Sequence, residues 1–222
     1  MEEKTVNQTT NPKRQQRHVR ALAYGAVCLA MSIVLARVMP SYRLAPHGPS
    51  ISIASLAPLF LYIYLFGFKY GALITIAYTA VLTATAQPGN LMGGPFQVML
   101  DYLIPYMSLV LIALVPKVLN KNGNGGKLME IGIYIGLTIF ALIRWFSQSL
   151  SGMIFWSAPS WGFSLFFNSP GLIDAAIAAI VLVALFRSKA FVKELQKIQE
   201  FQNGGKKLKV SEGAVQAEGV TI

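Results

Sequence analysis

The chain is short of charge. Only 13% of its 222 residues are Asp, Glu, Lys or Arg, and nine acidic residues stand against nineteen basic ones. A soluble domain of ordinary composition carries about 25% charged residues. Hydrophobic residues make up 54% of the chain and lie in blocks long enough to cross a bilayer. The composition therefore excludes an ordinary soluble domain and predicts an integral membrane protein.

Cysteine, histidine and the common catalytic motifs are scarce or missing. The single cysteine, Cys28, can form no disulfide within the chain and is interpreted as a small buried apolar residue. The two histidines, His18 and His47, lie outside the apolar blocks. The sequence contains no HExxH, Walker A or GxSxG motif. We therefore expect no catalytic residues, no metal site and no cofactor, and do not expect an enzyme.

Six apolar blocks predict an all-α membrane protein with six transmembrane helices. A hydrocarbon core of about 30 Å needs about 20 helical residues. The blocks are Ala21–Met39, Ile51–Phe66, Tyr70–Ala86, Pro95–Val115, Met129–Phe155 and Gly171–Phe186. The second and sixth blocks are short by this measure, so their ends are expected to use interfacial residues.

The net charge of +10 is concentrated on one side of the predicted membrane. This distribution argues against a surface for nucleic acid. Sixteen of the nineteen Lys and Arg residues lie before the first block, after the last, or in the second and fourth connections. The positive-inside rule places these regions, and hence both termini, in the cytoplasm. We expect a multi-pass protein of the bacterial cell membrane, embedded in lipid and without a nucleic-acid partner.

The chain is expected to have one membrane domain with cytoplasmic ends. Residues 1–20 and about 203–222 are polar and predicted to be disordered. Residues 190–202 carry an apolar stripe with helical spacing. The predicted division is a basic tail at 1–20, a six-helix membrane domain at 21–187, and a helical extension with a second tail at 188–222.

Polar residues inside the apolar blocks indicate a candidate site. An arginine within a membrane span, such as Arg144, costs roughly 2.5–3.5 kcal/mol on insertion scales unless it is paired, hydrated or used. Arg144, Gln148 and Gly152 are spaced i, i+4, i+8 and share one helix face. Asp101 in the fourth block has two interpretations: it pairs with Arg144, or both residues face a ligand. Asp174 follows Ser169-Pro170 and is interpreted as complementing the dipole of the helix that begins there.

The outward connections, which follow the first, third and fifth blocks, contain more varied polar and aromatic residues than the inward ones. All three tryptophans, Trp145, Trp156 and Trp161, lie in residues 144–168, which run from the fifth block into the connection that follows it. They either form an interfacial aromatic belt or offer flat faces to a flat polar solute. In the first block, Ala26 and Ala30 form a small-xxx-small pair, extended by Ala23 and Gly25, that allows another helix to approach closely. That helix belongs either to this chain or to a partner subunit.

Several segments together resemble the thiamine-specific substrate-binding (S) components of energy-coupling factor (ECF) transporters, the ThiT/YuaJ family. In chain order they are PHGPSISIASLAPLF, GFKYGAL, PFQVMLDYLIPYMSL, SGMIFWSAPSW and FFN, and the resemblance covers about residues 20–187. It implies the substrate-binding subunit of an ABC importer, which is not itself an enzyme. Such a subunit captures extracellular thiamine and works with a membrane coupling subunit and two ATPase subunits.

The resemblance also implies roles by position. Asp101 stands where the family has an acid that bonds the aminopyrimidine, and Trp156 where a tryptophan stacks on the ligand. Ala26 and Ala30 match the pair that contacts the coupling subunit. With the other residues of the shared face and of the third outward connection, the predicted substrate-binding set is Asp101, Tyr102, Arg144, Gln148, Gly152, Trp156, Trp161, Phe163 and Asn168.

Departures from the family pattern leave alternatives open. Gln148 stands where histidine is typical, Phe163 lies near a typical tyrosine, and the first outward loop has no tryptophan. One alternative is the same kind of subunit for another small heteroaromatic ligand, such as a pyrimidine precursor. The other is an autonomous secondary transporter, for which the sequence offers no inverted repeat or broken helix.

Overall fold

The computed structural model describes residues 12–37, 42–43, 50–51, 54–86, 91, 93–119 and 126–202. The described chain is almost entirely helical, which confirms the predicted all-α class. Its helices are α1 (Pro12–Arg37), α2 (Ala57–Ala84), α3 (Gly94–Val98), α4 (Ile104–Met107), α5 (Leu111–Leu119), α6 (Gly126–Phe155), α7 (Trp161–Phe167), α8 (Pro170–Arg187) and α9 (Lys189–Gln202). A π-helical turn, η2 (Met99–Leu103), and a 3-10 turn, η3 (Ser108–Val110), lie between α3 and α5. Two short strands, β1 (Tyr42–Arg43) and β2 (Ser50–Ile51), pair antiparallel.

Five helical stretches of the described chain are long and apolar enough to cross a membrane. They are Arg14–Arg37, Ala57–Ala84, Gly94–Val115, Ile131–Phe155 and Trp161–Arg187. The second stretch contains two of the six predicted spans. It is broken at Gly67, whose φ of 75° and ψ of −168° are non-helical and easily adopted only by glycine.

Contacts with α1 show that the chain reverses at Gly67. Tyr62, before the break, donates a hydrogen bond to the carbonyl of Ala21, and Tyr70, after it, bonds His18. Both therefore lie beside the first half of α1. A straight helix would carry residue 70 about 12 Å beyond residue 62. The residues after Gly67 then run back along α1, so that Arg37 at its end bonds Thr85.

Glycine allows α1 and the first half of α2 to pack closely. A side chain on Gly25 would come within 2.9 Å of the Tyr62 hydroxyl, so only glycine leaves room for this ring. The hydroxyl of Tyr62 donates to the carbonyl of Ala21 at 3.0 Å. Gly25 thus serves a contact within the chain. Ala26 and Ala30, the predicted coupling pair, are exposed on another side of α1.

The core lies where α2, α5, α6 and α8 meet. Phe60 of α2 packs edge-on against Phe140 of α6 with ring centroids 5.6 Å apart, and both side chains are buried. At Gly136 of α6 a side chain would meet the backbone of Ile112 at 3.0 Å, so α5 and α6 are in close backbone contact there. Small Ala178 brings α8 to the same cluster. This packing fixes α6 and α8, which carry most of the polar residues described below.

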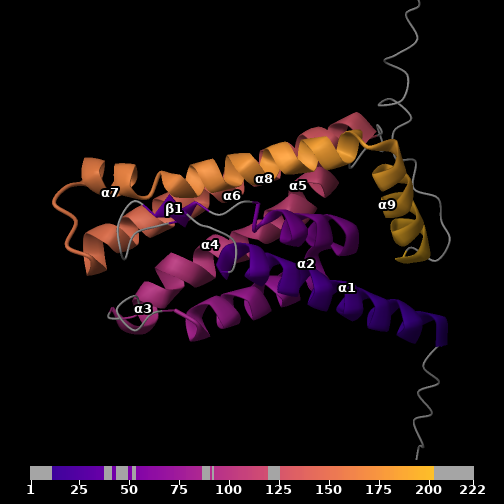
Figure 1. Ribbon diagram of the computed structural model, residues 1–222, viewed down its shortest axis with the longest axis horizontal. Helices are drawn as coiled ribbons and strands as arrows, with labels where there is room; N and C mark the ends of the chain where they lie inside the picture. The colour runs from indigo at the N-terminus through magenta and orange to yellow at the C-terminus, as the bar shows by residue number, and fades with distance from the viewer. Residues whose placement is uncertain are drawn as a thin grey trace, which may run out of the picture.

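The ends of the described chain meet at one end of the molecule. α1 begins at Pro12, so residues 12–20 are helical where a disordered tail was expected, and residues 1–11 and 203–222 lie outside the described part. The expected extension at 190–202 corresponds to α9, which lies across the end of the bundle near the start of α1 (Figure 1). Arg17 and Gln202 join them, each donating a side-chain hydrogen bond of 3.3 Å to the carbonyl of the other.

Candidate substrate-binding site

The fourth span contains a local π-helical turn around Asp101. The N–H of Ile104 donates to the carbonyl of Met99, a π-type bond that passes over Leu100. Pro105 has no N–H to offer to Leu100 or to Asp101. The carbonyl of Leu100 accepts from Ser147 at 2.6 Å, and that of Asp101 accepts from Gln148 at 3.2 Å. Side chains of α6 thus satisfy the carbonyls that the irregular turn releases, an arrangement that is common at functional sites.

The carboxylate of Asp101 accepts two side-chain hydrogen bonds. Gln97, one turn earlier, donates from its amide to Oδ2 at 3.1 Å, and the indole N–H of Trp156 donates to the same oxygen at 3.5 Å. Gln97 is itself almost fully buried, and its carbonyl oxygen accepts from the N–H of Gly93. The carboxylate is therefore held between α3 and the end of α6, while 40% of the Trp156 surface remains exposed.

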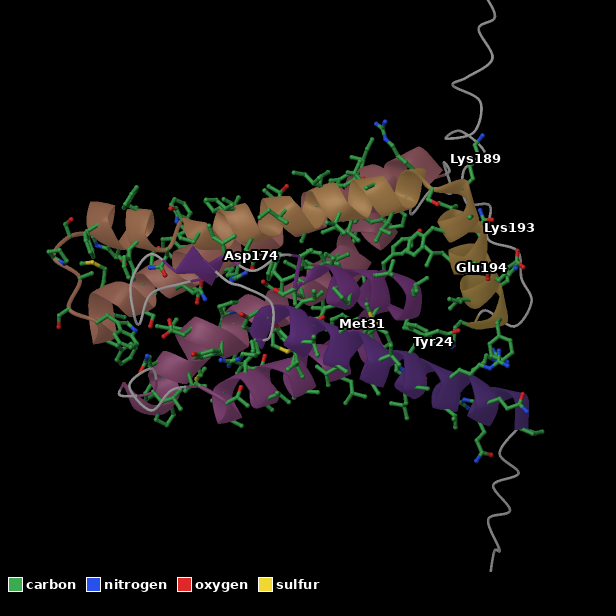
Figure 2. All side chains as sticks on the ribbon, in the orientation of Figure 1. Tyr24, Met31, Asp174, Lys189, Lys193 and Glu194 are labelled. Atoms are coloured by element: carbon green, nitrogen blue, oxygen red, sulfur yellow. The ribbon has the colours of Figure 1, made fainter. Side chains whose placement is uncertain are left out.

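The buried partner of Arg144 is Asp174, not Asp101. Arg144 Nη1 lies 3.0 Å from Asp174 Oδ2, and the two residues are only 7% and 2% exposed. Asp174 lies on the side of α8 that faces the bundle (Figure 2). The expectation that Asp174 complements the helix dipole was wrong in its placement. Pro170 begins α8, and the first turn of that helix holds no acidic residue. Asp174 instead supplies the counter-charge that a buried arginine requires.

Two further polar atoms border this ion pair. Among the described residues, Arg144 Nε and Gln148 Oε1 are buried without a hydrogen-bond partner. Both lie 3.6 Å from the point that a side chain on Gly171 would occupy. The amide of Gln148 is oriented by its bond to the Asp101 carbonyl, which can only accept, so its oxygen must face Gly171. Gln148 therefore links Asp101 to the surroundings of Arg144.

The Arg144 guanidinium also lies over an aromatic ring. Its central carbon is 5.7 Å from the centroid of the Tyr106 ring, and Tyr106 packs edge-on against Tyr78 with centroids 5.1 Å apart. A cation above a ring face is attracted by the ring quadrupole. Together with Asp174, these contacts explain how α6 tolerates an arginine inside the membrane part of the chain.

Helices α6 and α7 meet through Gly152. A side chain on Gly152 would lie 2.3 Å from the Ser164 hydroxyl, so only glycine permits this approach. Ser164 donates to the carbonyl of Ser149 at 2.7 Å, and Asn168 donates to the carbonyl of Ser164 at 2.9 Å. Gly152 and Asn168 therefore both contribute to the contact between α6 and α7.

The remaining predicted residues are spread over different surroundings. Tyr102 is half-buried and packs against the core. Trp161 stacks on Phe146 with centroids 6.3 Å apart, and Phe163 stacks on Phe167 at 5.7 Å. The side chains of Trp161 and Phe163 are each nearly half exposed. The hydrogen bonds and ring contacts of the described chain join neither of them to Asp101.

Sequence reasoning left three polar residues out of the site. Ser147 was missed, Asp174 was placed at a helix end, and Gln97 was noted only as a neighbour. The signal was present: Arg144, Ser147, Gln148 and Ser151 follow at i, i+3, i+4 and i+7, a polar stripe in an apolar helix. Gln97 stands one turn from Asp101, at i, i+4.

The arrangement suits recognition of a small solute that carries positive charge and hydrogen-bond donors. Asp101 offers a carboxylate inside the membrane domain, and Trp156 offers a partly exposed ring beside it. Within the described ranges, no three His, Cys, Asp or Glu residues are grouped in a way that could hold a metal ion. Chemically, the described groups can bind and orient a solute through charge, hydrogen bonds and ring stacking.

The fold and its buried polar site define a class, the multi-pass all-α membrane proteins that handle small solutes. The chain belongs to the thiamine transporter protein family (Thia_YuaJ), whose sequence profile matches residues 22–194. It is similar in structure to ThiT from Listeria monocytogenes, with a TM-score of 0.59, 18% identity, and coverage of 81% of this chain and 98% of that one.

A second solved structure, described as the S component of a bacterial ECF transporter, shares the fold. Its TM-score is 0.51 at 18% identity, and the match covers 80% of this chain and 99% of that one. No curated protein matches the sequence.

Proposed function

We propose that this protein is the substrate-binding (S) component of an ECF-type importer that captures thiamine from outside the cell. The observation that carries the proposal is the Asp101 carboxylate, set in a π-helical turn between Gln97 and the partly exposed Trp156. Membership of the thiamine transporter family supports the substrate. The S-component fold supports the role of a binding subunit.

The charges of the site favour a cation. The Arg144–Asp174 pair is neutral overall, which leaves the carboxylate of Asp101 as the net charge. Thiamine carries a permanent positive charge on its thiazolium ring and an exocyclic amine on its pyrimidine ring. A carboxylate can accept from the amine through a charge-assisted bond. A tryptophan face attracts the cation by about 0.5–2 kcal/mol.

The predicted binding residues have different roles in this proposal. Asp101, Gln148 and Trp156 form its centre, with Tyr102 and Arg144 beside them. Gly152 and Asn168 hold α7 against α6, which gives the outer wall of the site its shape. Trp161 and Phe163 form its exposed aromatic rim.

The proposed partners are a membrane coupling subunit and two ATPase subunits that energise uptake. Ala26 and Ala30 are exposed on α1, and small residues allow a helix of another subunit to approach closely. The proposed protein makes and breaks no covalent bond itself. We also propose that residues 21–187 form the membrane domain and that 1–20 and 188–222 serve as its cytoplasmic ends.

Binding to the purified protein tests the substrate. We expect thiamine to bind with low-micromolar affinity or better in calorimetry and to quench tryptophan fluorescence, since Trp156 lies at the centre of the site. Asp101→Asn should weaken binding at least tenfold, the loss of about 1.4 kcal/mol or more. Glu194→Gln, which removes an exposed acid on α9, is the matched control and should bind as the parent does.

Two results would contradict the proposal. Absence of heat and quenching at millimolar thiamine would remove thiamine as the substrate, and a thermal-shift panel of pyrimidines would then show whether another heteroaromatic ligand takes its place. Uptake that continues in cells lacking the coupling ATPases would show an autonomous transporter instead.

A further inference from the structure

The end of the molecule that carries α9 presents a group of exposed basic side chains. We call this group the basic platform. Its members are Arg14, Arg20, Lys69, Arg187, Lys189, Lys193 and Lys197. The described segments that supply them contain three acids, Glu194, Glu200 and Asp174. Asp174 is buried in its pair with Arg144, and Glu194 pairs with Lys197 at 2.6 Å. The platform therefore carries a clear excess of positive charge.

Three of these cations adjoin apolar runs. Arg20 precedes the apolar run of α1, Lys69 follows the reversal at Gly67, and Arg187 is the last residue of α8. The three helices are long and apolar enough to cross the hydrocarbon core, and we expect a charged side chain beside such an apolar run to lie where that core ends. Phosphate headgroups occupy that depth in a bilayer.

The remaining lysines lie on a helix that crosses this end of the bundle. α9 lies steeply across the direction of α8 (Figure 1), and Lys189, Lys193 and Lys197 recur every fourth residue along it. Lys189 and Lys193 lie on its outer side (Figure 2). The exposed side of α9 therefore carries a row of cations, while its apolar side packs against the bundle.

The inner side of α9 is fixed to the start of α1. Leu195 is buried, and the guanidinium of Arg20 lies 4.0 Å from the centroid of the Phe201 ring. Arg17 and Gln202 are joined by two reciprocal hydrogen bonds. These contacts hold the lysines of α9 and the arginines of α1 in one rigid arrangement.

Much of this arrangement lies outside the part of the chain that matches the family. The match covers residues 22–194, so Arg14, Arg17, Arg20, Lys197 and Phe201 lie outside it. Phe68 and Tyr24, which are 43% and 42% exposed, lie near the same boundary. Exposed aromatic side chains at this depth are typical of the membrane interface.

We propose that the basic platform binds the anionic headgroups of phospholipids in the cytoplasmic leaflet. The depth of the cations favours lipid over an acidic protein partner, because three separate segments bring them to the headgroup level. Each Lys or Arg near an anionic membrane surface strengthens association by about fivefold. Binding at the platform would hold α9, and through it the start of α1, against the membrane.

Hydrogen exchange in nanodiscs of defined composition tests this proposal. We expect the backbone amides of α9 to exchange at least fivefold more slowly in discs with about 30% phosphatidylglycerol than in pure phosphatidylcholine. High salt should reduce the difference, because exposed charges are screened. Native mass spectrometry should show phosphatidylglycerol retained in preference to phosphatidylcholine.

Two triple variants separate charge from other causes. Lys189→Gln, Lys193→Gln and Lys197→Gln together should reduce the lipid dependence without lowering thermal stability, since these side chains are exposed. The matched control replaces the same three lysines by arginine and should keep the lipid dependence of the parent protein.

Four outcomes would overturn the proposal. One is equal exchange in both kinds of disc, and another is loss of the lipid dependence in the arginine variant. The third is equal slowing by inorganic phosphate in phosphatidylcholine discs, which would identify a site for free phosphate. Slowing that appears only when acidic coupling proteins are added would likewise replace lipid by a protein partner. None of these readouts depends on thiamine.

Discussion

Arg144 Nη1 lies 3.0 Å from Asp174 Oδ2, and this ion pair joins α6 to α8 inside the membrane domain. Arg144 and Asp101, which were considered as partners from the sequence, are therefore not paired. Asp101 instead accepts hydrogen bonds from Gln97 and Trp156. A buried arginine that is already neutralised does not repel a cationic ligand. The pair therefore reconciles an arginine near the site with a substrate of positive charge.

Breaking this pair should be costly. Asp174→Asn leaves a buried guanidinium without its counter-charge, and the loss of one partner of a buried pair typically costs about 3–5 kcal/mol. Thermal unfolding in detergent should show a large fall in stability. Arg144→Gln combined with Asp174→Asn removes both charges and should recover most of the loss.

An exposed ion pair provides the control for that experiment. Lys197→Gln breaks the Lys197–Glu194 pair on the surface of α9 and should change stability by less than about 1 kcal/mol. If Asp174→Asn were as mild as Lys197→Gln, the buried pair would have no structural role.

A serine at Gly171 should stabilise the protein. Its Cβ would sit at ordinary contact distance, 3.6 Å, from Arg144 Nε and Gln148 Oε1. Its hydroxyl can accept from the first atom and donate to the second, which gives partners to two buried polar groups at a gain of about 1 kcal/mol. Gly171→Ala is the matched control. Alanine is the better helix former, so a higher melting temperature for serine than for alanine identifies the hydrogen bonds; the reverse order would rule them out.

The amino-acid sequence predicts the helical spans because apolar length is a local property. Blocks such as Met129–Phe155 correspond closely to helices of the structure, here α6. The reversal at Gly67 was expected from the short break between two blocks. The helical start of α1 was not predicted, because residues 12–20 are polar and their helix is held by contacts with distant Gln202 and Tyr70.

The site was harder to predict, because pairing inside the bundle depends on which helix faces are adjacent. Asp101 and Trp156 could be chosen as candidate site residues from their residue type and from their position relative to the apolar blocks. The choice of Asp174 as the partner of Arg144 needed the packing of α6 against α8, which spacing along the chain does not contain. The outward stacking of Trp161 and Phe163 likewise depends on the direction of α7, which Gly152 and Ser164 determine.

Closing the space at Gly152 should separate α7 from α6. In Gly152→Ala the new methyl group would lie 2.3 Å from the Ser164 hydroxyl, and relieving such overpacking typically costs about 1–3 kcal/mol. Thermal unfolding measures this cost. Adding Ser164→Ala removes the clashing oxygen, so the double variant should regain stability, less about 1 kcal/mol for the lost bond to Ser149. A double variant no more stable than Gly152→Ala would place the strain elsewhere.

Pro105 should control binding through the backbone of Asp101. Pro105→Ala supplies an N–H that can reach the carbonyl of Leu100 or Asp101, where Ser147 and Gln148 now donate. The π-helical turn can then relax toward a regular α-helix, which rotates the Asp101 carboxylate away from Gln97 and Trp156. We expect unchanged or higher thermal stability together with at least tenfold weaker thiamine binding in calorimetry. Pro170→Ala is the control, because a proline at the first position of a helix lacks an N–H that would be unpaired there anyway. Stability and affinity that fell together would indicate general damage, whereas full affinity in Pro105→Ala would show that the π-helical turn does not position Asp101.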